Sequence, residues 1–319
     1  MRHFISLFDI DRSELQSIMS IATQVKSMLA EGQRPDWFAG YVLAMLFEKP
    51  SLRTRVSFEA GMVQLQGAGL FLGQEVGWQS RESTADFTRV LAQYADFVVC
   101  RSKKHASVEE LASFNVVPVI NGLTDLCHPC QALADLLTMM EDHSSLSGKT
   151  ITFVGDGNNV SRSLALACAM TDVHFRLLGP SDYFMDDADV AKIHDRYPSA
   201  NIHQTESAKE ALESADFVYT DVWTSMGQEA ESAKRRADFA DFQLNESIMS
   251  LAPSHCKVLH CLPAKRGEEI TDGVIDSPNS LIVEQAGNRM HAQKGLLIWL
   301  ALEHGMLTLE RLRADGLKL

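Results

Sequence analysis

The sequence predicts an α/β protein with two domains, each a mostly parallel sheet flanked by helices. Its 319 residues, 45% of them hydrophobic, are enough for two cores of ordinary size. Short apolar runs rich in β-formers alternate with amphipathic stretches throughout, which is the pattern of parallel strands joined by helices. A polar stretch, Glu141–Lys149, divides these elements into two series.

The first series belongs to an expected N-terminal domain, residues 1–140. Its apolar runs predict strands at Tyr41–Phe47, Phe97–Cys100 and Val117–Ile120. Its amphipathic runs predict helices at Val56–Leu65, Val108–Phe114 and Ala132–Met140.

The second series belongs to an expected second domain, residues 141–288. We predict strands at Ile151–Val154, Phe175–Leu178, Phe217–Tyr219 and Lys257–His260, and helices at Val160–Met170 and Ala188–Tyr197. A long helical pattern, Asn288–His304, comes last, and we expect residues 289–319 to pack back on the first domain. Ligands of such folds bind beyond the carboxyl ends of the strands.

Composition and charge argue against several classes of protein. With 29 basic and 42 acidic residues the net charge is −13, which would repel nucleic acid. The apolar segment Leu296–Leu302 is far shorter than the ~20 residues of a membrane helix, and Met1–Asp11 lacks the features of a secretory leader. Six cysteines at irregular spacing do not form a disulfide framework. We therefore expect a cytoplasmic protein with no nucleic-acid or membrane partner.

The turn after the first strand combines several groups that bind phosphate. Ser51-Leu52-Arg53-Thr54-Arg55 lies between the strand and a helix, so it offers unpaired N–H groups, two hydroxyls and two guanidinium groups at a helix start. Taken alone, these residues are explained equally well by a serine N-cap followed by solvated arginines.

A second set of polar residues follows later elements of the same series. Arg101 comes just after the strand Phe97–Cys100, and His128 and Gln131 open the helix that contains Ala132–Met140. Arg101 and His128 can donate to a carbonyl oxygen as it gains charge, and Gln131 can both donate to and accept from an amide. A lone arginine is usually solvated and a lone histidine usually structural, but together with the Ser51–Arg55 turn they predict a site for an acyl phosphate.

These motifs resemble those of the transcarbamylase family. Ser51–Arg55 is similar to the family's carbamoyl-phosphate motif, and His128-Pro129-Cys130-Gln131 is similar to its His-Pro-x-Gln motif. The resemblance covers nearly the whole chain and includes Arg81–Ser83, Gly155–Asn159, Asp221–Gly227, His260–Pro263 and Asn288–Gln293. The Ser-Met-Gly loop at Ser225–Gly227 and the His-Cys-Leu-Pro segment at His260–Pro263 are similar to members that use ornithine.

The resemblance implies a reaction and a set of site residues. The carbamoyl group of carbamoyl phosphate would pass to the δ-amine of L-ornithine, giving L-citrulline and phosphate in arginine metabolism, with no cofactor and no metal. It implies carbamoyl-phosphate binding by Ser51, Leu52, Arg53, Thr54, Arg101, His128, Gln131, Cys261, Leu262 and Arg289, of which Arg101, His128, Cys261 and Arg289 would be catalytic. It implies ornithine binding by Asn159, Asp221, Ser225 and Met226.

Two positions depart from the family pattern. The family is built on trimers, in which a neighbouring subunit contributes a Gln or His to the carbamoyl-phosphate site, so a homotrimer or a multiple of it is expected. The aligned position here is Gly77, and Gln79 is the nearby residue that could replace it.

Leu52 stands where many relatives have Thr, and related enzymes for N-acylated ornithines can carry a bulky apolar residue there. The alternative is a transcarbamylase acting on another amine, such as N-acylated ornithine or putrescine. Enzymes for acylated ornithines lack the Ser-Met-Gly loop, which is intact here at Ser225–Gly227, and aspartate would require extra cationic side chains, so ornithine is preferred.

The implied mechanism makes a demand on the acceptor amine, which must be neutral although its pKa in water is ~10.4. Desolvation on domain closure and nearby positive charge would lower that pKa, and the phosphate leaving group can accept the proton. Arg101, His128, Arg289 and the Thr54 hydroxyl would stabilise the charge on the carbonyl oxygen. Cys261, beside Asp221 in the family, is expected to orient the amine rather than to form a covalent bond.

Three other functions were weighed against this one. A dinucleotide enzyme is suggested by Gly155-Asp156-Gly157 after a strand, but the third glycine position holds Val160, and no acidic residue ends the next strand. A redox or zinc module is suggested by Cys127-His128-Pro129-Cys130 and by the cluster His255, Cys256, His260 and Cys261. The first has no matching second pair, and in strand Lys257–His260 with its flanks the alternation predicts that neighbouring side chains, such as His260 and Cys261, point to opposite faces. A non-catalytic protein of this fold would not need the near-complete set of site residues.

Overall fold

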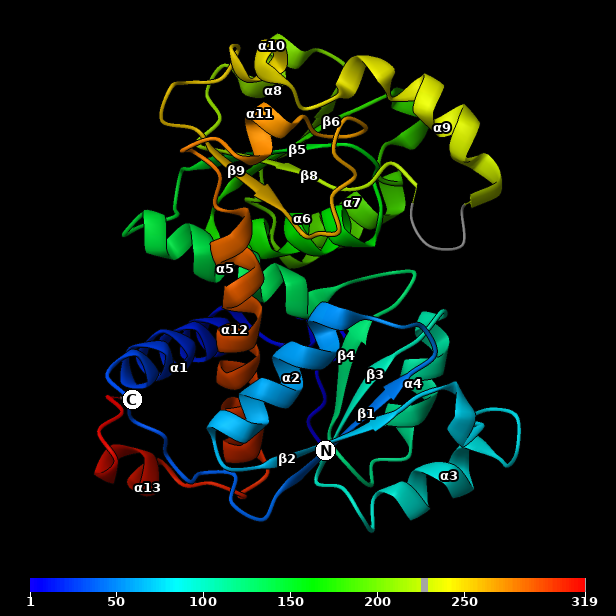
Figure 1. Ribbon diagram of the computed structural model, residues 1–319, viewed down its shortest axis with the longest axis vertical. Helices are drawn as coiled ribbons and strands as arrows, with labels where there is room; N and C mark the ends of the chain where they lie inside the picture. The colour runs from blue at the N-terminus through cyan, green and yellow to red at the C-terminus, as the bar shows by residue number, and fades with distance from the viewer. Residues whose placement is uncertain (225–228, 319) are drawn as a thin grey trace. The chain divides into compact units, whose positions relative to one another are not determined.

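The structure is a computed structural model that describes residues 1–224 and 229–318. The chain forms two compact units, one from Met1–Leu137 with Gly287–Leu319 and one from Thr138–Ala286. Two helices, α5 (Pro129–Asp142) and α12 (Ile282–Glu303), carry the chain between the units (Figure 1).

The first unit contains a parallel sheet whose strand order, within the described residues, is β2-β1-β3-β4. Its strands are β1 (Val42–Phe47), β2 (Ala68–Leu72), β3 (Phe97–Arg101) and β4 (Val119–Leu123). The central strands β1 and β3 are almost entirely buried, which is why their sequences are apolar apart from Arg101 at the end of β3. Their register pairs Phe47 with Arg101, so the chain leaves both strands at the same edge of the sheet.

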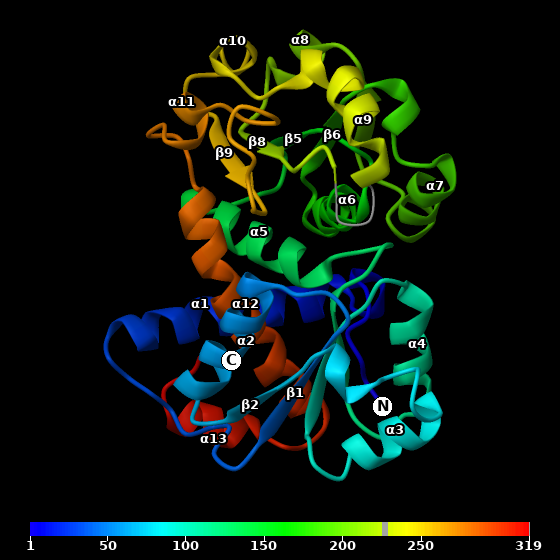
Figure 2. The same ribbon diagram turned by 45° about the vertical axis from the view of Figure 1, so that its right-hand side comes forward.

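Helices cover both faces of this sheet. Those of the first unit, besides parts of α5 and α12, are α1 (Arg12–Ala30), α2 (Leu52–Gln64), α3 (Thr84–Leu91), α4 (His105–Ser113) and α13 (Leu309–Ala314). On one face α3 and α4 bury a core with Leu46 and Val98, and α2 and α12 lie on the other side (Figures 1 and 2). A Cβ atom on Gly295 of α12 would lie 2.5 Å from the carbonyl oxygen of Ile18 in α1, so this position requires glycine. The C-terminal helix thus packs on the first domain, as predicted.

The second unit contains another parallel sheet, and its order in the part of the chain that is described is β7-β6-β5-β8-β9. The strands are β5 (Thr150–Val154), β6 (His174–Leu178), β7 (Ile202–Thr205), β8 (Phe217–Thr220) and β9 (Lys257–His260). The helices are α6 (Asn159–Thr171), α7 (Asp187–Arg196), α8 (Ala208–Leu212), α9 (Ser232–Asp238), α10 (Glu246–Met249) and α11 (Asp272–Ile275). One sheet face is covered by α6 and α7 and the other by α8, α10 and α11 (Figure 2).

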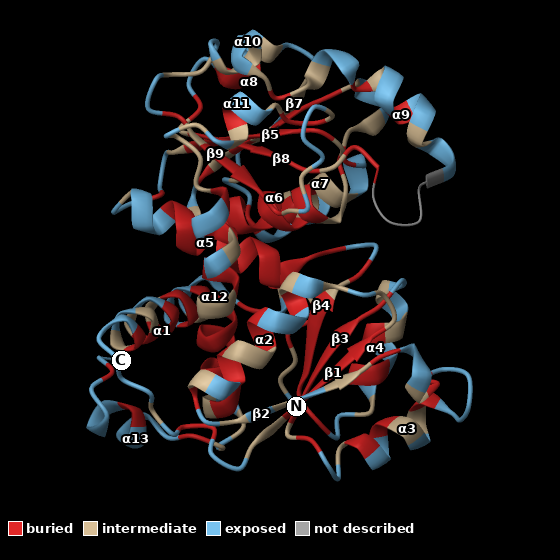
Figure 3. Ribbon diagram, viewed as in Figure 1, coloured by how far each residue is buried: buried red, intermediate tan, exposed pale blue. Residues whose placement is uncertain are grey.

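The predicted fold class is confirmed, since both units have parallel sheets flanked by helices. Burial is concentrated in the inner strands, which Figure 3 shows as red in both units. Among residues 1–224 and 229–318, no helix is long and apolar enough to cross a membrane. The edge strands β2 and β7 were not predicted from the sequence. The residues of β7, Ile-His-Gln-Thr, are half-buried or exposed and carry no continuous apolar run, whereas β2, Ala-Gly-Leu-Phe-Leu, is apolar and could have been predicted.

Candidate active site

The phosphate-binding turn has the predicted strand, turn and helix geometry. Helix α2 begins at Leu52, and the Ser51 hydroxyl oxygen caps it by accepting from the Thr54 amide at 3.3 Å. The Ser51 hydroxyl also donates to the Thr54 hydroxyl oxygen at 3.0 Å. Leu52 is 75% exposed, so its side chain is not part of a packed core.

The Thr54 hydroxyl oxygen is the meeting point of two guanidinium groups in the first unit. Arg289 of α12 donates to it at 2.7 Å, and Arg101 at the end of β3 donates to it at 3.3 Å. All three side chains are buried, Thr54 completely and the arginines to within 6% of full burial. Arg101 reaches the start of α2 because β3 is paired with β1, the strand that leads into the turn. The structure therefore brings together the residues that the motifs selected.

Gln131 extends this cluster in one defined orientation. Its amide oxygen accepts from Arg289 at 2.9 Å, and its amide nitrogen donates to the carboxylate of Asp135 at 2.8 Å. Asp135 is fully buried one turn further along α5 and was missed by the sequence analysis. The signal that could have found it is the i, i+4 spacing from Gln131, which places both side chains on one helix face.

His128 is held in its neutral form. Burial is the largest cause that lowers its pKa well below the ordinary value, and positive charge on Arg289, Arg101 and Arg53 lowers it further. A neutral imidazole can still donate one N–H to a substrate oxygen. The same three arginines make this a strongly positive site in a chain whose net charge is −13, which is the electrostatic requirement for binding a phosphate.

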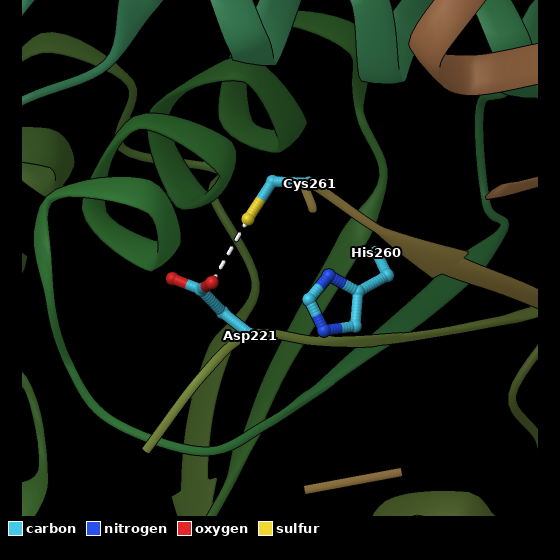
Figure 4. Close-up of side chains that lie close together, drawn as sticks. All are labelled: Asp221, His260 and Cys261. Atoms are coloured by element: carbon cyan, nitrogen blue, oxygen red, sulfur yellow. Dashed lines mark hydrogen bonds between the residues drawn. The ribbon is translucent and has the colours of Figure 1, made fainter. Parts of the chain in front are cut away.

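The second unit forms its own polar cluster around Asp221, just after β8. The Cys261 thiol donates to one carboxylate oxygen at 2.9 Å, as Figure 4 shows, and the Asn158 amide donates to the other at 3.1 Å. Asn158 also caps α6 through its side-chain oxygen, so it fixes Asp221 relative to that helix. The family resemblance implies Asn159, the first residue of α6, and no sequence motif pointed to the role of its neighbour Asn158.

A buried histidine and glutamate support the segment that carries Cys261. His260 accepts the Leu262 amide through Nδ1 at 2.8 Å, and its Nε2 lies 3.1 Å from a carboxylate oxygen of Glu269. The first contact makes Nδ1 the acceptor, so the N–H is on Nε2 and donates to Glu269. Leu262 has a φ of +57°, a left-handed conformation that a leucine rarely adopts without such support. His260 and Glu269 were not selected from the sequence.

One geometric expectation about this segment is wrong. His260 and Cys261 do not point to opposite faces, because β9 ends at His260 and the alternation of the strand ends with it. Ligand atoms of Asp221, His260 and Cys261 lie within 4.8 Å of one another (Figure 4). These three groups could offer donors to a metal, but binding one there would break the Cys261–Asp221 hydrogen bond and a His260 contact.

The glycine-rich turn after β5 serves the packing of the second unit. A Cβ atom on Gly157 would lie 2.4 Å from the backbone nitrogen of Met185, so the space beside it is filled by the chain itself. Buried Arg235 pairs with Asp156 in this turn and donates to the carbonyl of Trp223. Glycine at position 157 is therefore required by packing within the unit, without any dinucleotide phosphate.

Gln79, Ser225 and Met226 are three further residues that the family resemblance implies. Gln79 is exposed in the turn after Gly77 and has a φ of +63°, and its expected role concerns a neighbouring copy, so it stays a prediction. Ser225 and Met226 lie outside the described residues.

Comparison with known proteins agrees with this geometry. Residues 2–141 match the family model of the aspartate/ornithine carbamoyltransferase carbamoyl-P binding domain. Residues 147–300 match the model of the Asp/Orn binding domain of the same family. The chain belongs to the aspartate/ornithine carbamoyltransferase family. The transcarbamylase resemblance noted from the motifs is thereby confirmed, and the chain is a carbamoyltransferase by family.

Relatives of this carbamoyltransferase carry a more specific name. Ornithine carbamoyltransferase of Anoxybacillus flavithermus is 47% identical over 93% of this chain and 96% of its own length. The Archaeoglobus fulgidus protein of that name is 42% identical over 93% of this chain and 97% of its own length. The structure of ornithine carbamoyltransferase from Pyrococcus furiosus has a TM-score of 0.89 at 41% identity and covers 93% of this chain and 96% of that one.

Proposed function

We propose that this carbamoyltransferase transfers the carbamoyl group of carbamoyl phosphate to the δ-amine of L-ornithine, giving L-citrulline and phosphate. The observation that carries the donor assignment is the buried Thr54 hydroxyl, held by Arg101 and Arg289 at the start of α2. Relatives that are 42–47% identical over most of this chain and are named ornithine carbamoyltransferase support the acceptor.

The phosphate of the donor binds at the start of α2 in this proposal. The backbone N–H groups of Leu52 and Arg53 are there, together with the Ser51 and Thr54 hydroxyls, and the helix end is electropositive. Arg53 adds a guanidinium, which can bind phosphate oxygens in a bidentate manner. Leu52 contributes only its backbone, because its side chain is exposed.

The carbamoyl group lies against Arg101, His128 and Gln131. As the amine attacks, negative charge grows on the carbamoyl oxygen, and Arg101 with the neutral His128 can donate to it. Gln131 is oriented for this role, because its oxygen is occupied by Arg289 and one N–H by Asp135. One amide N–H of Gln131 then remains for the donor.

The acceptor is bound by groups of the second unit. Asp221 carries negative charge that suits the α-ammonium of ornithine, and Asn159 with Ser225 and Met226 completes the expected set. Cys261 donates to Asp221 and so lies where it can orient the δ-amine, and the carbonyls of Cys261 and Leu262 are expected to contact the carbamoyl group. The amine must lose a proton, which the departing phosphate can accept.

We assign domain roles accordingly: residues 1–140 bind carbamoyl phosphate, 141–288 bind ornithine, and 289–319 return to the first domain. The C-terminal segment contributes to the donor site, because its first residue, Arg289, donates to Thr54. The six cysteines are all free and buried, which supports a reducing, cytoplasmic location.

We also propose a homotrimer or a multiple of it. Leu52, Val56 and Val63 are between 48% and 75% exposed and lie on one side of α2. Leu70 on the edge strand β2 is 47% exposed as well. A second copy covering this apolar stripe would lie beside the phosphate turn, where a neighbouring Gln79 is expected to act. Light scattering on Val63→Glu should show smaller particles than the unsubstituted protein.

A steady-state assay with four acceptors tests the proposal. Carbamoyl phosphate is supplied with ornithine, N-acetylornithine, putrescine or aspartate, and the carbamoylated product is measured. Ornithine should give the highest kcat/KM by at least ~10²-fold, because the other acceptors leave buried polar groups unpaired. A preference for N-acetylornithine or putrescine would replace ornithine with that amine, and no transfer to any of the four would refute the reaction.

A further inference from the structure

A fully buried lysine lies on α12 outside the residues assigned to the reaction. Lys294 has no exposed surface, although it is among the largest side chains of the first unit. Its ammonium group donates to the side-chain oxygen of Gln64 at the end of α2. Within the described residues it has no ion-pair partner, so only one of its three N–H donors is matched. Burying such a group is costly, which calls for an explanation.

The surroundings of Lys294 do not supply the missing negative charge. The pKa of Lys294 is lowered to about 7, mainly by burial and also by the positive charge on Arg34, in the loop after α1. On α2 the charged side chains Arg55 and Glu59 pair with each other at 3.1 Å, and Lys26 of α1 donates to Asn288. An apolar residue of equal length would pack at this position without any of these costs.

The placement of Lys294 links it to the donor site. Helices α2 and α12 are joined at two points: Thr54 accepts from Arg289, and Gln64 accepts from Lys294. Between these points α12 passes over Gly61, where an added Cβ atom would lie 3.5 Å from Lys294 Cγ and 3.9 Å from Met290 Cγ. The hydrogen bonds to Thr54 and Gln64, on either side of the close contact at Gly61, restrict how far α12 can slide or turn on α2.

We propose that Lys294 is a positioning residue for carbamoyl-phosphate binding, because its hydrogen bond to Gln64 sets the position of α12 on α2 and thereby aims Arg289 at Thr54. The proposal rests on the assignment of the donor site above. Ridge-and-groove packing alone leaves two helices free to shift by fractions of an ångström, and a hydrogen bond such as that between Arg289 and Thr54 weakens steeply with such a shift.

Substitution of each partner tests the proposal. Lys294→Met keeps the aliphatic stem and removes the donor, and Gln64→Met removes the acceptor. Each should raise the KM for carbamoyl phosphate roughly five- to tenfold, the range of one hydrogen bond, and leave the KM for ornithine within about twofold. The double variant should be no worse than either single variant, because both remove the same interaction. Lys149→Met, which removes a lysine 3.0 Å from Asp216 in the other unit, is the matched control and should leave the donor KM unchanged.

Stability and phosphate binding separate this role from a structural one. Urea unfolding should show that Lys294→Met is at least as stable as the unsubstituted protein, whereas its affinity for inorganic phosphate in isothermal titration falls about as much as its donor KM rises. An unchanged donor KM and phosphate affinity in Lys294→Met would overturn the proposal. So would a loss of stability with no change in phosphate affinity, since that pattern marks a purely structural residue. The phosphate titration does not depend on transfer, so it remains decisive if the assigned reaction fails.

Discussion

Removal of the Thr54 hydroxyl is the sharpest test of the donor site. Thr54→Val keeps the shape of the side chain and deletes the oxygen that accepts from Arg289 at 2.7 Å and from Arg101 at 3.3 Å. The shorter contact, to a buried guanidinium, should account for most of the effect. A hydrogen bond to a charged group contributes about 1.5–3 kcal/mol, so kcat/KM for carbamoyl phosphate should fall roughly ten- to 150-fold. The longer contact is near the limit of a hydrogen bond and adds little.

Steady-state kinetics with ornithine at saturation measures this loss, and Thr54→Ser is the matched control. Serine keeps the hydroxyl and loses only a methyl group, so its kcat/KM should stay within about tenfold of the original. The losses from Thr54→Val and from an Arg289 substitution should add to less than their sum, because both remove the hydrogen bond between these two residues. A loss below threefold in Thr54→Val, or equal losses in both variants, would show that the hydroxyl does not organise the arginines.

Three further predictions concern individual side chains. Leu52→Thr should change kcat/KM for carbamoyl phosphate by less than about tenfold, since the side chain is exposed, whereas Arg53→Ala should lower it by at least ~10²-fold. The pKa of His128 is lowered in the folded state, so below about pH 6.5 the unfolded state binds a proton that the folded state does not, and the free energy of unfolding should fall as the pH drops through that value. Urea unfolding at pH 7.5 and 5.5 should show a smaller fall in the free energy of unfolding for His128→Asn than for the unsubstituted protein. Lys294 has a pKa of about 7 in the folded state against an ordinary value of 10.5, so between these values the unfolded state binds one more proton than the folded state. The free energy of unfolding should therefore rise by up to ~1.4 kcal/mol per pH unit in this range. Urea unfolding of Lys294→Met at pH 7 and 9 should lack this rise.

The central strands of both sheets are predictable from local sequence. Strand β1, for example, is buried on both faces, so its residues form a continuous apolar run that stands out in any window. The edge strand β7 gives no such signal, because its residues, Ile-His-Gln-Thr, are mostly polar and lie at half-buried or exposed positions. The ends of the chain also depend on distant partners: Phe4 pairs with Ile120 beside β4, a contact that no local pattern near Phe4 contains.

The sequence by itself determined the fold class, the phosphate-binding turn at Ser51–Arg55 and the family, because each depends on residues that are near one another in the chain. Only the tertiary structure decided which distant groups meet. Arg289 reaches Thr54 across 235 positions and Cys261 reaches Asp221 across 40, while the buried support from Glu269 and Lys294 has no local motif at all. The physical reason is that periodicity reports which face of an element is buried, whereas the partner buried against it is chosen by how the elements pack.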